Sequence, residues 1–255
     1  MNTPLPIPGR ISRALRWTKE RALPGLLLSI LVCAPIAHAQ APRRSANYTV
    51  SVRELKIPDR ARQAFDKGLE RLEKFDAVGG RTQFARAIAA FPRYYEAYYH
   101  LGVAELRLGD DKKAAEAFQK AIDLSGGRYP WAQFALGFVL CRLGQYAEAK
   151  SIIDRGLEVD STSAGGQVML SIVLFDLDRL EEAEQSARQA LLRNPGFAPA
   201  YLALADVHGR RRESRMQLHD LDAYLKLAAD GPDRKLVRQA REAIQQKVAN
   251  KKERD

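Results

Sequence analysis

The sequence predicts an all-α fold, an α-solenoid of five tandem helix-turn-helix repeats followed by a C-terminal capping helix. The first observation is self-similarity, because matching segments begin at Leu101, Leu136 and Leu170, which are 35 and then 34 residues apart. The second is that small residues recur at fixed places inside each apolar stretch. Such a period marks stacked repeats, in which one unit cannot bury its own apolar face and needs neighbours.

The first 39 residues have the features of a secretory signal peptide. Five basic residues between positions 10 and 21 precede an apolar run, and Ala37-His38-Ala39 forms a cleavage motif. A retained membrane anchor is the alternative, but Pro24 and Pro35 interrupt the run, which spans about 16 residues, whereas a membrane-spanning helix needs roughly 20. We therefore expect cleavage after Ala39, export to the periplasm or the medium, and no stable membrane span in the mature chain.

The two cysteines and the net charge indicate how the mature protein is processed and what it can bind. A lipoprotein signal has a small residue before its cysteine, whereas Val32 precedes Cys33, so lipidation is not expected. Loss of residues 1–39 removes five basic side chains and one acidic one, so the formal net charge falls from +10 to +6. Cys141 then has no partner for a disulfide within the chain. Nucleic acid is not an expected partner, because no platform of interleaved aromatic and basic residues is visible.

Residues 40–57 mix Pro, Ser and basic residues before helical periodicity begins near Pro58. This composition predicts a flexible lead-in. An extended strip over residues 48–55, laid on the first repeat or inside its groove, is the open alternative.

Five repeats follow within residues 58–230, at about 61–94, 95–128, 130–163, 164–197 and 198–230. Where two helices cross closely, a large side chain would force them apart. Each first helix accordingly has a small residue in register: Gly68, Gly102, Gly137, Ser171 and Ala205. Each of the first four second helices has two more small residues, which flank Phe84, Phe118, Ile153 and Ala187 in turn.

This pattern resembles the tetratricopeptide repeat family, whose helix-turn-helix unit has small residues at unit positions 8, 20 and 27 and an aromatic or apolar residue at 24. The resemblance covers roughly residues 61–230 and implies a right-handed α-solenoid. The fifth copy departs from the family pattern, with Gln217 and Tyr224 where alanine is expected. Terminal repeats are commonly atypical, because one of their faces has no repeat to meet.

Residues 232–250 predict the amphipathic helix that caps the solenoid. Leu236, Val237, Ile244 and Val248 recur at helical spacing, and the outer face is rich in Arg, Lys and Gln. Such a helix covers the apolar end of a repeat stack. Residues 251–255 are expected to form a disordered tail.

Catalytic motifs are absent from the sequence, which lacks H-E-x-x-H, G-x-S-x-G, a P-loop and G-x-G-x-x-G. We therefore expect that the protein is not an enzyme and that it binds no cofactor and no metal. His100 and His208 lie at helix positions that predict structural histidines. His219 lies beside Asp220 and near Asp222, but neighbouring helix positions point to different faces, which argues against a metal site.

The resemblance implies that the first helices line a concave groove for a protein or peptide partner. The groove has no Lys and Asn clamp for a carboxylate; it is apolar and aromatic, with arginines at its margin. An exposed apolar patch usually marks a binding site, so we expect an amphipathic helix or an extended apolar segment as ligand. Two alternatives are that these side chains pack neighbouring helices, or that they form a homodimer. The predicted groove residues are Phe65, Leu69, Tyr99, Val103, Arg107, Trp131, Phe134, Phe138, Arg142, Val168, Ile172 and Phe175.

A secondary basic patch comprises Arg210, Arg211, Arg212 and Arg215. It predicts either a site for an acidic partner, an anionic lipid or a phosphate, or a solvated turn between helices. The function predicted from the whole sequence is an exported protein–protein interaction scaffold. The alternatives are a substrate- or lipid-handling accessory module of bacterial envelope biogenesis and a module for homo-oligomerisation.

Overall fold

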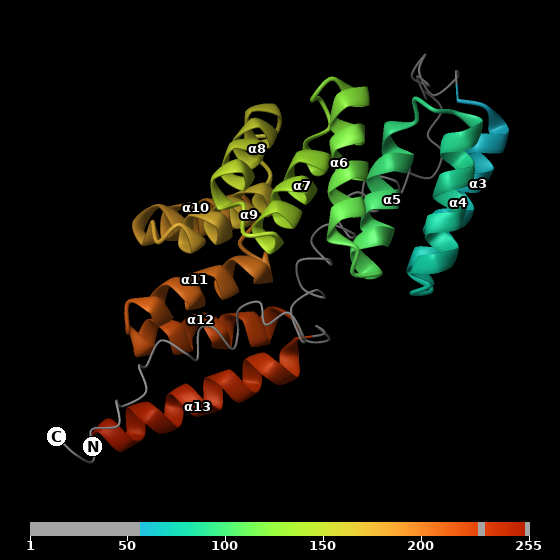
Figure 1. Cartoon of the computed structure of the whole chain (residues 1–255). Coiled ribbons are helices and arrows are strands. Elements are labelled where there is room, and N and C mark those ends of the chain that lie inside the picture. Colours follow the sequence, from blue (N-terminus) through green and yellow to red (C-terminus); the bar gives the residue numbers. More distant parts are fainter. Residues whose placement is uncertain (1–56, 229–232, 253–255) are drawn as a thin grey trace, which may run out of the picture. The chain divides into compact units, whose positions relative to one another are not determined.

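The computed structural model describes residues 57–228 and 233–252, and this part of the chain contains eleven α-helices and no β-strand (Figure 1). It divides into two compact units. We call described residues 57–161 the N-terminal unit and those from 162 onwards the C-terminal unit. The predicted signal peptide, residues 40–56 of the lead-in and residues 253–255 of the tail lie outside the described residues.

The helices are arranged as consecutive pairs. The N-terminal unit has α3 (Asp59–Glu73) with α4 (Ala77–Ala90), α5 (Tyr95–Arg107) with α6 (Asp111–Ser125), and α7 (Pro130–Arg142) with α8 (Tyr146–Val159). The C-terminal unit has α9 (Ala164–Asp176) with α10 (Leu180–Arg193), α11 (Ala198–Arg210) with α12 (Ser214–Leu227), and the final helix α13 (Arg234–Lys252). The helices of a pair pack on each other, and α4, α6, α10 and α12 each also pack on the helix that follows. The predicted all-α fold of tandem helix pairs is confirmed.

The same backbone turn joins the two helices of every pair. One residue in each turn has a positive φ: Phe75, Gly109, Gly144, Asp178 and Arg212. Glycine adopts this left-handed conformation without steric cost, whereas other residues resist it. Gly109 and Gly144 therefore suit the turn directly, and the recurrence of the conformation at the repeat spacing shows that the repeat architecture imposes it elsewhere.

The small residues of the first helices lie opposite the large residue of their partner helices, as predicted. A Cβ atom added to Gly68 would lie 2.5 Å from the Phe84 ring, and one added to Gly102 would lie 2.6 Å from the Phe118 ring. At Gly137 the nearest atom would be Ile153 Cγ1, at 2.4 Å. These separations are shorter than van der Waals contact, so the helices of each pair approach closely only because the Cβ is missing.

In the C-terminal unit, different residues form the corresponding close contact between α9 and α10. Ser171 takes the place of glycine, and its hydroxyl donates a hydrogen bond of 2.6 Å to the Ala183 carbonyl oxygen. The large residue of the partner helix is here reduced to Ala187, which is fully buried. Because both sides of this contact are small, the space holds a polar side chain that bonds to the facing backbone.

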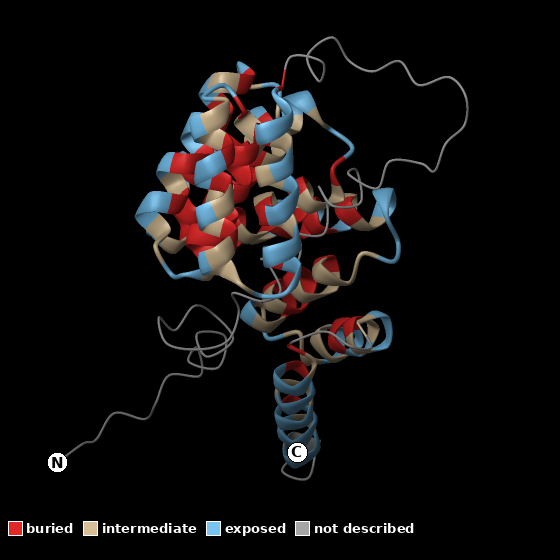
Figure 2. Cartoon of the chain, turned by 90° about the vertical axis from the view of Figure 1, so that its right-hand side faces the viewer, coloured by how far each residue is buried: buried red, intermediate tan, exposed pale blue. Residues whose placement is uncertain are grey.

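The terminal helix α13 packs on the fifth helix pair. Val237 and Ile244 of α13 are buried in one cluster with Ala205, Leu221 and Tyr224. Much of the rest of α13 is exposed, as the helix marked C in Figure 2 shows. The helix ends at Lys252, two residues into the segment predicted as a tail. Among the described residues, none of the helices has the length and hydropathy to cross a bilayer.

Candidate functional site: the first helices and the arginines at their ends

The predicted groove residues lie on first helices of both units, on α3, α5 and α7 and on α9. Half of the twelve are buried rather than displayed at the surface: Tyr99, Val103, Phe134, Phe138, Val168 and Phe175. Buried side chains contribute to packing and cannot contact a partner without unfolding of the unit around them. The surface open to a partner is therefore smaller than the sequence pattern suggests.

Aromatic packing explains why the middle of the groove is closed in the N-terminal unit. The Tyr99 ring lies 5.6 Å from the Phe118 ring of α6 and 5.4 Å from the Tyr129 ring, centroid to centroid. Phe134 comes so close to α8 that a Cβ on Gly156 would lie 2.6 Å from its ring. Both side chains fill the space between helices, which is the role of packing residues.

His100 belongs to the same aromatic core. Its ring stacks on Phe84 at 5.5 Å and meets the edges of Phe65 and Tyr99 at 5.3 and 5.0 Å. Burial, together with the positive charge of Arg107, lowers the pKa of His100 to about 3. The histidine is therefore neutral and structural, as predicted.

Four apolar groove residues remain partly exposed: Phe65, Leu69, Trp131 and Ile172. Phe65 still contacts the aromatic core through Tyr94, at a centroid distance of 4.9 Å. Trp131, near the start of α7, places its ring edge-on to Phe134 at 6.0 Å and leaves part of its surface open. Trp131 thus combines a fixed orientation with exposed apolar area, which is typical of an anchor for a partner.

The two arginines predicted at the groove margin make contacts between repeats. Arg107, at the end of α5, donates to the Leu72 carbonyl oxygen of the preceding pair. Arg142, at the end of α7, donates through Nε to the Asp111 carboxylate of the preceding pair at 2.9 Å. Both side chains connect consecutive repeats, and a role in partner binding stays a prediction for them.

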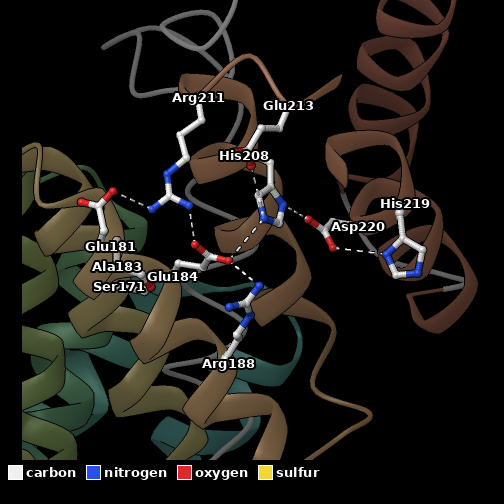
Figure 3. Close-up of polar contacts among 10 residues, drawn as sticks. All are labelled: Ser171, Glu181, Ala183, Glu184, Arg188, His208, Arg211, Glu213, His219 and Asp220. Carbon is white, nitrogen blue, oxygen red and sulfur yellow. Dashed lines mark hydrogen bonds and ion pairs between the residues drawn. The ribbon is translucent and has the colours of Figure 1, made fainter. Parts of the chain in front are cut away.

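Two arginines of the secondary basic patch behave in the same way. Arg210, at the end of α11, donates to Asp178 Oδ1 at 2.7 Å and lies over the Phe175 ring at 4.6 Å. Arg211 donates to Glu181 at 3.0 Å and also bonds Glu184 of α10 (Figure 3). Arg212 and Arg215 are both exposed. Half of the patch is therefore engaged between α11 and the α9–α10 pair, and it is less available to an external anion than the sequence suggests.

Glu184 is the centre of a polar cluster within the C-terminal unit (Figure 3). It pairs with Arg188 on its own helix and with Arg211, and its carboxylate lies 3.6 Å from His208 Nε2. Burial alone would raise the pKa of Glu184, but the hydrogen bond from Arg211 and the neighbouring positive charges hold this pKa below its ordinary value. Glu184 is thus a carboxylate that connects α10 to α11.

His208 joins this cluster to α12. Its Nδ1 lies 2.6 Å from Asp220 Oδ2, and both side chains are buried. His219, the neighbour of Asp220, is 79% exposed. Within the described part of the chain, no group of three or more His, Cys, Asp or Glu side chains is placed to hold a metal ion. The contacts of Glu184, His208 and Asp220 connect α10, α11 and α12.

Sequence reasoning missed the centre of this cluster. Asp220 was considered only beside His219, and Glu184 was not singled out. A signal existed for Asp220, because none of the other repeats has a charged residue at its register, which holds Gln83, Ala117, Ile152 and Ser186. Little signal existed for Glu184, because that register also holds the charged residues Lys150 and Arg81.

An exposed aromatic side chain was missed as well. Phe75 is 87% exposed at the turn after α3, and the Arg107 guanidinium lies 5.9 Å from its ring centroid. The available signal was that Phe75 occupies the turn position at which two later repeats have glycine, Gly109 and Gly144.

Comparison with known proteins agrees with this architecture. Residues 65–129 match a family described as tetratricopeptide repeat. Anaphase-promoting complex subunit 3 of Schizosaccharomyces pombe is 25% identical over 138 residues, which are 54% of this chain and 21% of that protein. The matched region therefore spans about a fifth of the length of that relative.

Two solved structures share the fold. TTC0263, a thermophilic TPR protein of Thermus thermophilus, is 20% identical with a TM-score of 0.64, covering 72% of this chain and 98% of its own. PilW, described as a widely conserved type IV pilus biogenesis factor, is 18% identical with a TM-score of 0.64, covering 74% and 91%. The family match covers residues 65–129, and these two structures share the arrangement of tandem helix pairs. Proteins of the tetratricopeptide repeat family are generally scaffolds for protein–protein interaction.

Proposed function

We propose that this protein is an exported adaptor that docks a segment of a partner protein on its first helices, without bond-making chemistry. The partly exposed Trp131 on α7 carries the proposal. Partners bind mainly through a few aromatic anchors whose orientation is already set. Phe65 and Leu69 of α3 add apolar surface that is half-buried in the unbound chain.

Few groove side chains are exposed, so the surface suits a short partner segment held by an aromatic anchor better than a long apolar segment. Because Tyr99, Phe134 and Phe138 are buried, a partner can contact only the partly exposed side chains of the first helices in the N-terminal unit. A short amphipathic helix or extended segment suits this surface. PilW, which shares the fold, is described as a type IV pilus biogenesis factor, and at 18% identity the likeness supports the fold alone.

Export is the second part of the proposal and rests on residues 1–39. A basic segment, an apolar run and Ala37-His38-Ala39 occur in the order of a cleaved secretory signal. N-terminal sequencing of the protein from the native host is expected to begin at Gln40. An intact N-terminus in the membrane fraction would contradict cleavage and indicate an anchor.

Site-specific photo-crosslinking tests the docking surface. A photoreactive phenylalanine analogue replaces Trp131 in one variant and Val78 in a control, since Val78 is 53% exposed on the second helix α4 of the same unit. Adducts are identified after irradiation of living cells. We expect a discrete protein adduct from position 131 and none from position 78.

Three results would contradict the proposal. Equal labelling from both positions would mean nonspecific contact. Adducts that contain lipid would favour the lipid-handling alternative. An adduct with a second copy of this chain would make the surface a homodimer interface instead.

A further inference from the structure

The outer face of the first helix pair carries a hollow that none of the predicted sites includes. It has a volume of about 420 Å³ and lies between α3 and α4, on the side that no other described helix covers. Arg60 and Lys67 of α3 and Arg86 of α4 line it, together with Gln63 and Gln83. Among the described residues, none of the three cations makes an ion pair or a hydrogen bond.

The residues of this face differ from those at the same register in the four later repeats. The Lys67 position is leucine in all of them: Leu101, Leu136, Leu170 and Leu204. The Ala64 position is a large side chain in all of them: Tyr98, Gln133, Gln167 and Tyr201. The first repeat therefore has a cation, Lys67, where the later repeats have leucine. It has a small side chain, Ala64, where they have a large one.

These residues argue against a further repeat stacked on this face. In the second repeat Ala97, at the register of Gln63, is fully buried against Ala61 and Ala87 of the first pair. Gln63 itself is exposed, and Lys67 on the same helix is exposed too. Burying an unpaired lysine under an apolar helix pair is strongly unfavourable, because the charge loses its hydration without gaining a partner.

The chain's own ends are poor candidates to fill the hollow. Residues 1–56 contain nine basic side chains and two acidic ones, and α13 contains seven basic and one acidic. Either would bring like charges together, which is unfavourable at close range. An occupant must instead supply negative charge.

We propose that this hollow is a second docking site, independent of the first-helix groove, for an acidic segment of a partner protein. Arg60 and Lys67 are seven residues apart on one helix, which separates them by about 10 Å along α3. Carboxylates three residues apart in a polyproline II segment lie on one face at nearly this spacing, because that conformation has three residues per turn and rises about 3.1 Å per residue. Arg86 contacts the segment from α4, and small apolar side chains of the segment enter the gap above Ala64.

A labelled peptide of the sequence (Glu-Ala-Ala)4, with blocked ends, is the probe for this site. Its binding to the purified full chain is followed by fluorescence anisotropy. Charge reversal in Lys67→Glu/Arg86→Glu is expected to weaken binding by about tenfold or more, since like charges then face the peptide. The matched control is Lys120→Glu/Arg155→Glu, which reverses the exposed residues at the register of Arg86 in the next two repeats.

The control pair is expected to bind within about twofold of the parent, and a (Lys-Ala-Ala)4 peptide is expected not to bind. Urea midpoints equal to that of the parent would show that the exposed substitutions leave the fold intact. Equal weakening by both pairs would overturn the proposal, because net charge would then explain binding. Absence of peptide binding by the parent would overturn it too. Binding to phosphatidylglycerol vesicles that is lost in Lys67→Glu/Arg86→Glu, with peptide binding unchanged, would assign the face to a membrane surface instead.

Discussion

The two units bury a histidine in opposite ways. His100 of the N-terminal unit lies among Phe65, Phe84 and Tyr99, with aromatic rings on several sides. His208 of the C-terminal unit lies between the carboxylates of Asp220 and Glu184. The first environment favours a neutral ring, whereas the second offers charge and hydrogen bonds.

The difference extends to the contacts that surround each histidine. Around His100 the helices approach through glycines that face phenylalanine rings, as Gly68 and Gly102 do. In the C-terminal unit the first-helix positions are Ser171 and Ala205, and arginine–glutamate pairs join the helices. The N-terminal unit therefore depends mainly on shape, and the C-terminal unit depends more on charge.

The largest expected effect is on shape in the N-terminal unit. Gly102→Leu forces a side chain into the Phe118 ring, and we expect it to lower the free energy of unfolding by about 3 kcal/mol. Urea unfolding measures the loss, and hydrogen exchange is expected to show it in α5 and α6. Ala85→Leu, at an exposed position of α4, is the control and should change stability by less than about 0.5 kcal/mol. A cost confined to α9–α12 would contradict the contrast between the units.

A smaller effect is expected when charge is removed from the C-terminal unit. Glu184→Gln weakens the bonds to Arg188 and Arg211, and we expect a loss of about 2 kcal/mol. Glu182→Gln on the same helix is the control, because Glu182 and its partner Arg179 are both about half exposed. Such surface pairs contribute little, so the control should lose less than about 0.5 kcal/mol. Equal losses in the two variants would mean that the buried cluster has no special role.

The pH dependence of stability tests the environment of His100. The folded-state pKa of His100 is about 3, below its ordinary value of 6.5, so the unfolded state binds a proton more readily. Stability from this group is complete above about pH 6.5 and falls as the pH drops toward 3, by about 1.4 kcal/mol per pH unit. Between pH 7.5 and 5.5, His100→Phe is expected to lose about 1.4 kcal/mol less than the parent in urea titrations. A His100→Phe variant with the parent's slope would disprove the assignment.

The smallest effect concerns the arginines that connect repeats. Arg142 is 22% exposed and bonds the Asp111 carboxylate, so Arg142→Ala is expected to cost about 1 kcal/mol. Arg155→Ala, at an exposed site of α8, serves as the comparison and should be nearly neutral. The loss should persist in about 0.5 M salt, because partly buried pairs are screened less than exposed ones. A loss that disappears in salt would place Arg142 among the surface pairs.

Much of the fold could be predicted because it depends on local periodicity. The positions of Gly68, Gly102 and Gly137 follow from the spacing of the repeats, and each lies opposite the large residue that the pattern indicated. The structural roles of His100 and His208 were also predictable, since both fall on the faces that neighbouring helices cover. Spacing along a helix fixes which face a residue occupies, and that is enough for these assignments.

The candidate site was less predictable because exposure depends on which side chains of neighbouring helices meet in space. The family register assigns Tyr99 and Trp131 to the same groove, yet Tyr99 is buried by α6 and the Tyr129 ring whereas Trp131 stays partly open. The register likewise cannot show that Arg142 pairs with Asp111, 31 residues earlier.

Sequence spacing alone was sufficient for the repeat length, the helix pairs and the close contacts between them, because the residues that form them recur at the same register in successive repeats. The packing of helices in three dimensions was needed to establish which groove residues remain at the surface, which arginines connect repeats, and that Lys67 and Arg86 line one hollow. The physical reason is that burial and ion pairing are properties of the space between helices. That space is defined only when the helices of successive repeats have packed together.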